Sequence, residues 1–181
     1  MAAVACAIVV ALVTLAGCAA APAPAPTTAT PTTAPVFASD EEALAAATEA
    51  YANYLKLSTA LAHDGGQDAE RMSDVAVGEA LATEIESLNG MSDAGTVGVG
   101  ELSFDSLTIQ TAELHSGSIT AYVCLDVSGS DVLDASGKSI LSDDRVERLP
   151  FEVGFIFDRE NQRLFLGRSE IWAGDNFCLP Q

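Results

Sequence analysis

The spacing of the apolar residues changes near Gly95, and this change constrains the fold more than any other feature of the sequence. Before Gly95, apolar residues recur every three or four positions, as on one face of a helix, and after it they recur at every second position, as on strands. Helices followed by strands are the element order of an α+β domain. We therefore expect a long amino-terminal helix and one or two short helices, packed on a curved antiparallel sheet of four to five strands.

The long helix is predicted to begin with a capping box. Ser39 and Glu42 have the spacing of that motif, and the acidic residues after Ser39 suit the positive end of a helix. The periodic pattern predicts a helix over residues 40–62, which ends where residues 63–66 break the pattern. Its predicted buried face comprises Leu44, Ala47, Tyr51, Tyr54, Leu55, Ser58 and Leu61.

Two shorter helices are predicted before the change of period. Asp68 is placed to cap the first, which runs to about Val75. The second runs from about Gly78 to Leu88, because the sequence Asn89 and Gly90 is a typical stop signal.

The strand half is clearest where apolar and polar residues alternate. The best strand carries its apolar residues at odd positions from Ile119 to Val127. Residues 134–138 predict a turn in which Gly137 takes a positive φ. Further extended segments are predicted at Val97 to Val99, Leu102 to Ile109, Phe151 to Phe157 and Leu164 to Trp172.

The first residues resemble the export signal of a bacterial lipoprotein. An apolar run too short to span a membrane leads into Leu15, Ala16, Gly17 and Cys18, which resemble a lipobox. The resemblance implies that the Cys18 thiol receives a diacylglyceryl group, that the chain is cut between Gly17 and Cys18, and that the new amino terminus is acylated, for example with palmitate. Two or three acyl chains form a stable membrane anchor, whereas a single chain binds only marginally. The alternative is an ordinary secretion signal with a chance cysteine.

Three regions follow from this interpretation. Residues 1–17 are the predicted signal peptide, residues 18–36 a lipidated Pro/Thr-rich tether, and residues 37–181 a single α+β domain. A polyproline II tether holds a domain a few tens of ångströms from the membrane, at ~3.1 Å per residue. No Lys or Arg precedes the apolar run, so we expect translation to start upstream of Met1.

The charge of the chain excludes some partners. It carries 26 acidic and 8 basic residues, a net charge of −18. Such a chain repels phosphate backbones, and its arginines form no basic run, so we expect no nucleic acid partner. We interpret the acidic residues as a surface that keeps an exported domain solvated, and we favour this interpretation over a cation-binding surface. The expected location is the outer face of the cell membrane.

Two cysteines remain in the predicted domain. Cys124 and Cys178 lie in an exported chain, where thiols oxidise, and we predict a disulfide between them. A metal site is the weaker reading, because it needs more ligands at closer spacing. We expect neither a metal nor a cofactor.

The order of elements resembles the nuclear transport factor 2-like, or cystatin-like, superfamily of cone-shaped domains. The likeness covers about residues 37–178 and depends on the long tyrosine-bearing helix and the later strands. The chain is also similar to uncharacterised lipoproteins of high-GC Gram-positive bacteria, which carry such a domain after a Pro/Thr tether. The resemblance implies a sheet that wraps the helix around a pocket. It implies no particular reaction, and no catalytic residue is carried over from the superfamily.

Few residues suggest chemistry, and each has an ordinary alternative. His63 with Asp64, and His115, are more readily explained as solvated residues at a helix end and in a turn. Asp126, Asp131 and Asp134 lack the pattern of a calcium loop. Four aromatic residues are candidates for a ligand pocket, although core positions explain such residues more often: Tyr51, Tyr54, Tyr122 and Trp172.

Three functions remain open at this point. The first is a membrane-anchored, non-catalytic binding or interaction module of the bacterial envelope, whose protein or small-molecule partner the sequence does not name. The second is a pocket enzyme of the cone-fold type, which would carry an ionisable group of shifted pKa in its cavity. The third is a structural envelope protein in which the tether matters more than the domain.

Overall fold

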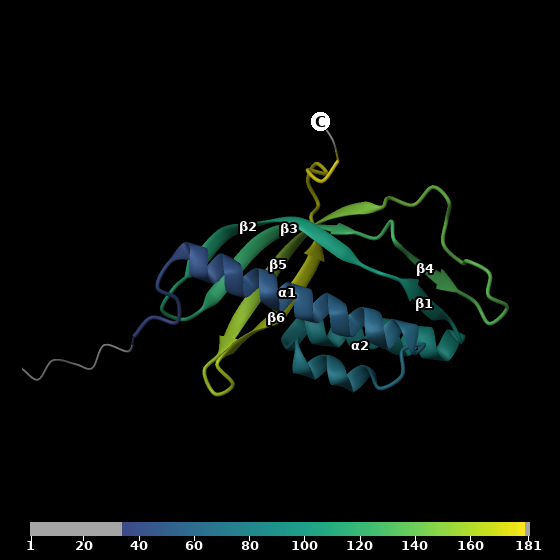
Figure 1. Cartoon of the computed structure of the whole chain (residues 1–181), viewed down its shortest axis with the longest axis horizontal. Helices are drawn as coiled ribbons and strands as arrows, with labels where there is room; N and C mark the ends of the chain where they lie inside the picture. Colours follow the sequence, from purple (N-terminus) through teal and green to yellow (C-terminus); the bar gives the residue numbers. More distant parts are fainter. Residues whose placement is uncertain (1–33, 180–181) are drawn as a thin grey trace, which may run out of the picture. The chain divides into compact units, whose positions relative to one another are not determined.

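The computed structural model describes residues 34–179, and these residues form an α+β fold, as predicted (Figure 1). The predicted signal peptide, Cys18 and the tether up to residue 33 lie outside the described residues. The helical elements are α1 (Asp40–His63), the 3₁₀ helix η1 (Ala69–Asp74) and α2 (Gly78–Ala94). The strands are β1 (Val97–Gly100), β2 (Ser103–Glu113), β3 (Ser118–Asp126), β4 (Ser130–Leu133), β5 (Arg148–Asp158) and β6 (Arg163–Ile171).

Helix α1 begins at the predicted cap. The Ser39 hydroxyl accepts the backbone N–H of Glu42 at 3.3 Å, and the Glu42 carboxylate accepts the N–H of Ala38 at 2.7 Å. The predicted buried face is confirmed except at Leu44, which is 37% exposed. Ala43 faces the core in its place, so the apolar stripe begins one residue earlier than predicted.

The first short helix differs from the prediction in its type and in its cap. It is a 3₁₀ helix, and Asp68 stands at its cap position with a φ of 56° and no capping hydrogen bond from its side chain. The backbone carbonyl of Asp68 instead accepts the N–H of Arg71 at 2.9 Å. The turn is thus closed by main-chain groups, and the carboxylate of Asp68 does not perform the predicted role.

Helix α2 continues six residues beyond the predicted stop, to Ala94. Gly90 inside a helix costs about 1 kcal/mol relative to alanine. Leu88 is buried and Met91 packs against the core, and this packing holds the helix together across the local stop signal. The helix ends at Gly95, which has a φ of 64° and donates its N–H to Ser92.

The strands form one sheet of four and a separate pair. The large sheet has the order β2-β3-β5-β6 with all neighbours antiparallel, and β1 pairs with β4. Register shifts interrupt the β2–β3 and β5–β6 ladders, and such bulges increase the local twist. The predicted turn at residues 134–138 is present, with Gly137 at a φ of 81°.

The core lies between α1 and one face of the large sheet, across which α1 runs in Figure 1. Alternate residues of β3 and β5 point toward the helix, as the two-residue period predicts. The largest fully buried side chains include Tyr51, Leu61, Met72, Leu88, Ile119, Phe155 and Leu166.

Candidate functional site

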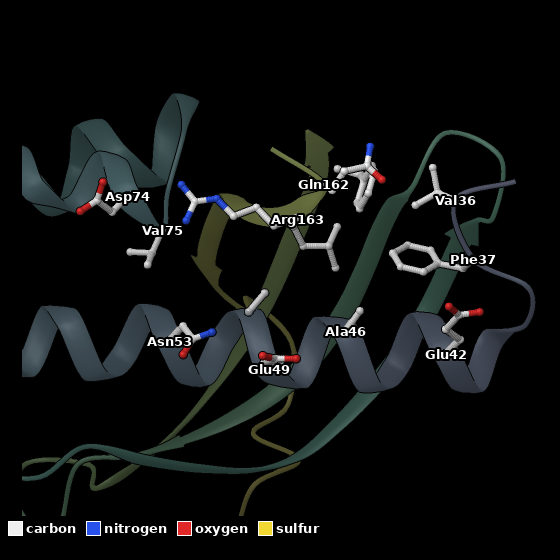
Figure 2. Close-up of a pocket in the computed structure, with 13 residues that line it drawn as sticks. Val36, Phe37, Glu42, Ala46, Glu49, Asn53, Asp74, Val75, Gln162 and Arg163 are labelled. Carbon is white, nitrogen blue, oxygen red and sulfur yellow. The ribbon is translucent and has the colours of Figure 1, made fainter. Parts of the chain in front are cut away.

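A cleft of about 420 Å³ lies beside the first half of helix α1, and we call it the α1 cleft (Figure 2). The first half of α1 lies along one side of the cleft, and the end of η1 with the start of β6 lies along the other. Small and apolar residues of both sides form its floor, namely Ala46, Ala50, Val75 and Leu164. Its volume lies in the range of small-molecule sites. Its lining residues are Val36, Phe37, Glu42, Ala46, Glu49, Ala50, Asn53, Asp74, Val75, Phe157, Gln162, Arg163 and Leu164.

The floor of the α1 cleft is apolar because of the residues that α1 presents there. Ala46 and Ala50 lie one helical turn apart on the same face, and their small side chains leave space where larger ones would fill it. At one end, Val36 and Phe37 both donate their backbone N–H to the carbonyl of Leu114, at 2.8 and 3.1 Å. The Phe37 ring meets the Phe157 ring edge-on, so this end of the cleft is firmly built.

The rim of the α1 cleft carries charged groups that the rest of the described chain leaves unpaired. Glu49 and Asp74 are exposed, and neither has an ion pair or side-chain hydrogen bond to another residue of 34–179. Arg163 also has no ion pair there, although its guanidinium lies 4.5 Å from the centre of the Phe165 ring. Its cross-strand neighbour is Asp158, whose pKa is lowered chiefly by a hydrogen bond from Asn161 and in smaller part by the charge of Arg163. Figure 2 shows the Arg163 side chain extending toward Asp74. Charges of both signs therefore face the cleft.

A second, smaller cavity of about 180 Å³ lies between α1, α2 and the sheet. The two oxygens of Glu84 accept hydrogen bonds from the Tyr54 hydroxyl at 2.7 Å and the Ser58 hydroxyl at 2.6 Å. Burial, and then the charge of Glu84, raise the pKa of both Tyr51 and Tyr54 far above the usual value. The hydroxyls therefore stay protonated, and Glu84 serves to join α2 to α1.

The four aromatic residues predicted to line a pocket fall into two groups. Tyr51 and Tyr54 lie together at the second cavity, with ring centroids 6.1 Å apart. Tyr122 points to the opposite face of the sheet, because its neighbours in β3 face the core. There it meets Trp172 at 4.9 Å and Phe177 at 5.6 Å. The structure does not bring the four together at one cavity.

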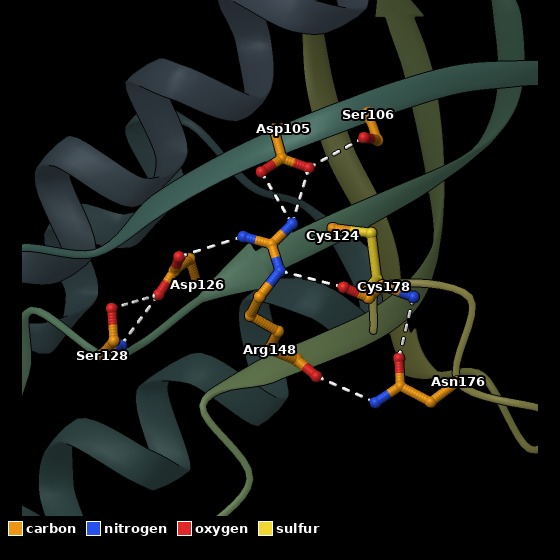
Figure 3. Close-up of polar contacts among 8 residues, drawn as sticks. All are labelled: Asp105, Ser106, Cys124, Asp126, Ser128, Arg148, Asn176 and Cys178. Carbon is orange, nitrogen blue, oxygen red and sulfur yellow. Dashed lines mark hydrogen bonds and ion pairs between the residues drawn. A yellow bond between two sulfur atoms is a disulfide. The ribbon is translucent and has the colours of Figure 1, made fainter. Parts of the chain in front are cut away.

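The predicted disulfide is present on that outer face (Figure 3). Cys124 and Cys178 are joined across 54 residues, with their Cα atoms 5.5 Å apart. The bond fixes the last described residues against β3, two residues before the end of that strand. This confirms the pairing that the sequence predicts.

Arg148 organises the polar groups around the disulfide (Figure 3). Its guanidinium donates to Asp105 at 2.8 Å, to Asp126 at 3.0 Å and to the carbonyl of Cys178 at 3.0 Å. The Arg148 hydrogen bond holds the pKa of Asp105 below its usual value, and hydrogen bonds from Ser128 are the main cause of the same effect at Asp126. This network ties β2, β3 and β5 to the C-terminal segment and lies away from the α1 cleft.

The remaining polar candidates from the sequence lie outside the α1 cleft. His63 Nε2 lies 2.7 Å from the carbonyl of Gly100, and the carbonyl of His115 accepts a hydrogen bond from Arg159. Asp131 accepts from Ser139, while Asp134 accepts the backbone N–H groups of its own turn. Within residues 34–179 no three ligating side chains are grouped for a metal ion.

Sequence reasoning missed the charged groups of the α1 cleft and Glu84. One half of the cleft has a sequence signal, because Glu42, Ala46, Glu49 and Asn53 recur at spacings of three and four on one face of α1. Asp74 and Arg163 have no such signal. They are 89 positions apart in the numbering, and they reach one cleft because the residues just after η1 pair with Leu166 of β6.

Comparisons with known proteins define the fold but no family. No family model matches the chain, and no curated protein matches it. The intermembrane space region of the chloroplast protein ARC6 is similar over 72% of this chain and 97% of that one, with a TM-score of 0.52 and 10% identity. A structure from Catenulispora acidiphila is similar over 70% of this chain and 89% of that one, with a TM-score of 0.45 and 13% identity. The likeness to ARC6 concerns the fold alone.

Across residues 34–179, no helix has the length and apolar character that crossing a bilayer requires.

Proposed function

We propose that this chain is a bacterial lipoprotein, anchored through Cys18 at the outer face of the cell membrane, whose domain is a non-catalytic binding module. The sequence Leu15 to Cys18 supports the anchor, and the disulfide supports an oxidising compartment outside the cytoplasm. The resemblance to cone-shaped domains and to lipoproteins of high-GC Gram-positive bacteria belongs to the same proposal. The ligand of the module occupies the α1 cleft.

One observation carries the binding function. The α1 cleft combines an apolar floor with rim charges that have no partner among residues 34–179. A few polar groups around an apolar cavity are the usual composition of a ligand site. The rim charges are exposed, and exposed charges suit recognition better than catalysis, which places its charged groups in sites closed to water. Glu84, the carboxylate of the second cavity, already has both oxygens hydrogen-bonded.

Replacing Cys18 with serine is expected to abolish the membrane anchor, because the hydroxyl does not replace the thiol in a thioether. The wild-type protein should remain in the membrane fraction after a high-salt wash, and mass spectrometry should find it cut before Cys18 and acylated. Cys6→Ser is the matched control, since Cys6 lies in the predicted signal peptide and should leave anchoring unchanged. An acyl-free wild-type protein, or one that keeps residues 1–17, would refute the anchor.

Filling the α1 cleft is expected to abolish ligand binding. Ala50 is half-buried in the floor of the cleft, and Ala50→Trp should occupy the space that a ligand needs. Neutral fragments screened by amide NMR shifts should contact Ala46, Ala50 and Leu164 in the wild type and lose these contacts in the variant. Ala45→Trp is the control, because Ala45 is exposed on the same helix outside the cleft. If the fragments gather elsewhere, the cleft is not the binding site.

A further inference from the structure

We infer that the α1 cleft binds an apolar α-amino acid, a zwitterion that carries an ammonium group, a carboxylate and an aliphatic body. This inference rests on the proposed function, because it names the ligand class of the same cleft.

The carboxylates of the rim are suited to bind an ammonium group of the ligand. Glu49 lies on α1, and Asp74 lies at the end of η1 on the other side of the cleft. An ammonium group donates in three directions and accepts none, so it suits a position between carboxylates. Glu42 adds a third carboxylate, one oxygen of which accepts the N–H of Ala38. The net charge of −18 strengthens the attraction for a cationic group.

Arg163 is suited to bind a carboxylate of the same ligand. Its guanidinium shares the cleft with three carboxylates, and yet none of them lies within ion-pairing distance of it. By contrast, Arg148 and Arg168 each pair with two carboxylates. Arg163 is held over the ring of Phe165, which positions it to bind a carboxylate through paired N–H groups. The nearby charge of Asp158, its cross-strand neighbour, forms no ion pair with it, so the guanidinium N–H groups remain free to bind a ligand carboxylate.

The floor of the α1 cleft is suited to contact an aliphatic side chain of the ligand. Between the charged groups lie Ala46, Ala50, Val75 and Leu164, whose side chains offer apolar contact. Asn53 and Gln162 add amide groups at the rim. An α-amino acid with an aliphatic side chain meets all three demands at once, since its two charged groups share one carbon and its side chain extends over the floor.

Three probes of six carbon atoms each separate the contributions of the charges. The probes are norleucine, hexylamine and hexanoate, titrated into the chain of residues 18–181 with Cys18→Ser and followed by amide NMR shifts. This chain keeps every residue that forms the described contacts. Norleucine is expected to bind about fivefold more tightly than hexylamine and about tenfold more tightly than hexanoate. Raising the salt from ~0.05 M to ~0.5 M should weaken norleucine binding, because the rim is exposed to screening ions.

Charge-removing variants assign each group of the ligand. Glu49→Gln and Asp74→Asn should each weaken norleucine and hexylamine about fivefold. Arg163→Gln should weaken norleucine to a similar degree and leave hexylamine no weaker than before. Glu86→Gln removes an exposed carboxylate of α2 outside the cleft, and it should change none of the affinities.

The outcomes distinguish this inference from the proposed function. If hexylamine binds as tightly as norleucine and Arg163→Gln changes neither, the zwitterion is wrong and the cleft remains a binding site for cations. If none of the three probes binds while neutral fragments still bind in the α1 cleft, the ligand class is wrong and the binding module stands. If neither probes nor fragments bind there, both proposals are wrong.

Discussion

Removing the disulfide is expected to lower the free energy of unfolding by about 4 kcal/mol. The bond closes a loop across 54 residues, and without it the unfolded chain gains the freedom of that loop. The folded state also loses the clamp that holds the C-terminal segment on β3, where Arg148 donates to the carbonyl of Cys178. Because a domain of this size is stabilised by only about 5–15 kcal/mol, the loss is a large share of the total.

Urea denaturation of the double variant Cys124→Ala/Cys178→Ala measures this effect. The unfolding midpoint should fall well below that of the oxidised wild type, and a reductant should bring the wild type close to the variant. The reductant should leave the variant itself unchanged, which is the control. A loss smaller than about 1 kcal/mol would mean that the chain-entropy argument does not describe this loop.

Replacing Gly66 with alanine is expected to cost roughly 3 to 5 kcal/mol. Gly66 has a φ of 76°, a conformation that costs a residue with a Cβ about 1 kcal/mol or more. The larger contribution is steric, because the added Cβ would overlap the backbone carbonyl of Leu88 in α2. A backbone group in the middle of a helix cannot move aside as a flexible side chain can, so the contact between the end of α1 and α2 would have to open.

Gly137→Ala is the matched control for Gly66→Ala. Gly137 has a similar φ of 81°, but an added Cβ would meet no atom within 4 Å. Its replacement should cost only about 1 kcal/mol, from the backbone conformation alone. Thermal or urea unfolding of both variants separates the two causes. Equal losses would show that the close approach of α2 to Gly66 contributes nothing measurable.

The second prediction depends on information that the sequence does not contain. Residues 63–66 are readable as the end of a helix, because a glycine pair after a histidine and an aspartate breaks the helical period. Nothing in that stretch shows that the carbonyl of Leu88 packs against Gly66. That contact joins two helices, and it exists only once both have docked on the sheet.

The start of α1 and the end of α2 show the same difference between local and tertiary information. The start of α1 was predictable because a capping box acts within four residues, and the hydrogen bonds of Ser39 and Glu42 form there. The end of α2 was not, because the local stop at Asn89 and Gly90 is outweighed by the burial of Leu88 and the packing of Met91. Local hydrogen bonds can be read from the chain, whereas packing against distant residues cannot.

The sequence by itself determined the α+β class, the start of the long helix, the alternating strands and the partners of the disulfide. These depend on period, on capping and on a small number of cysteines, all of which are properties of the chain. Only the tertiary structure decided that Tyr51 and Tyr122 lie on opposite faces of the sheet, and that Glu49, Asp74 and Arg163 border one cleft. The physical reason is that a binding site consists of side chains from distant segments, and their distances are set by how the helices and strands pack.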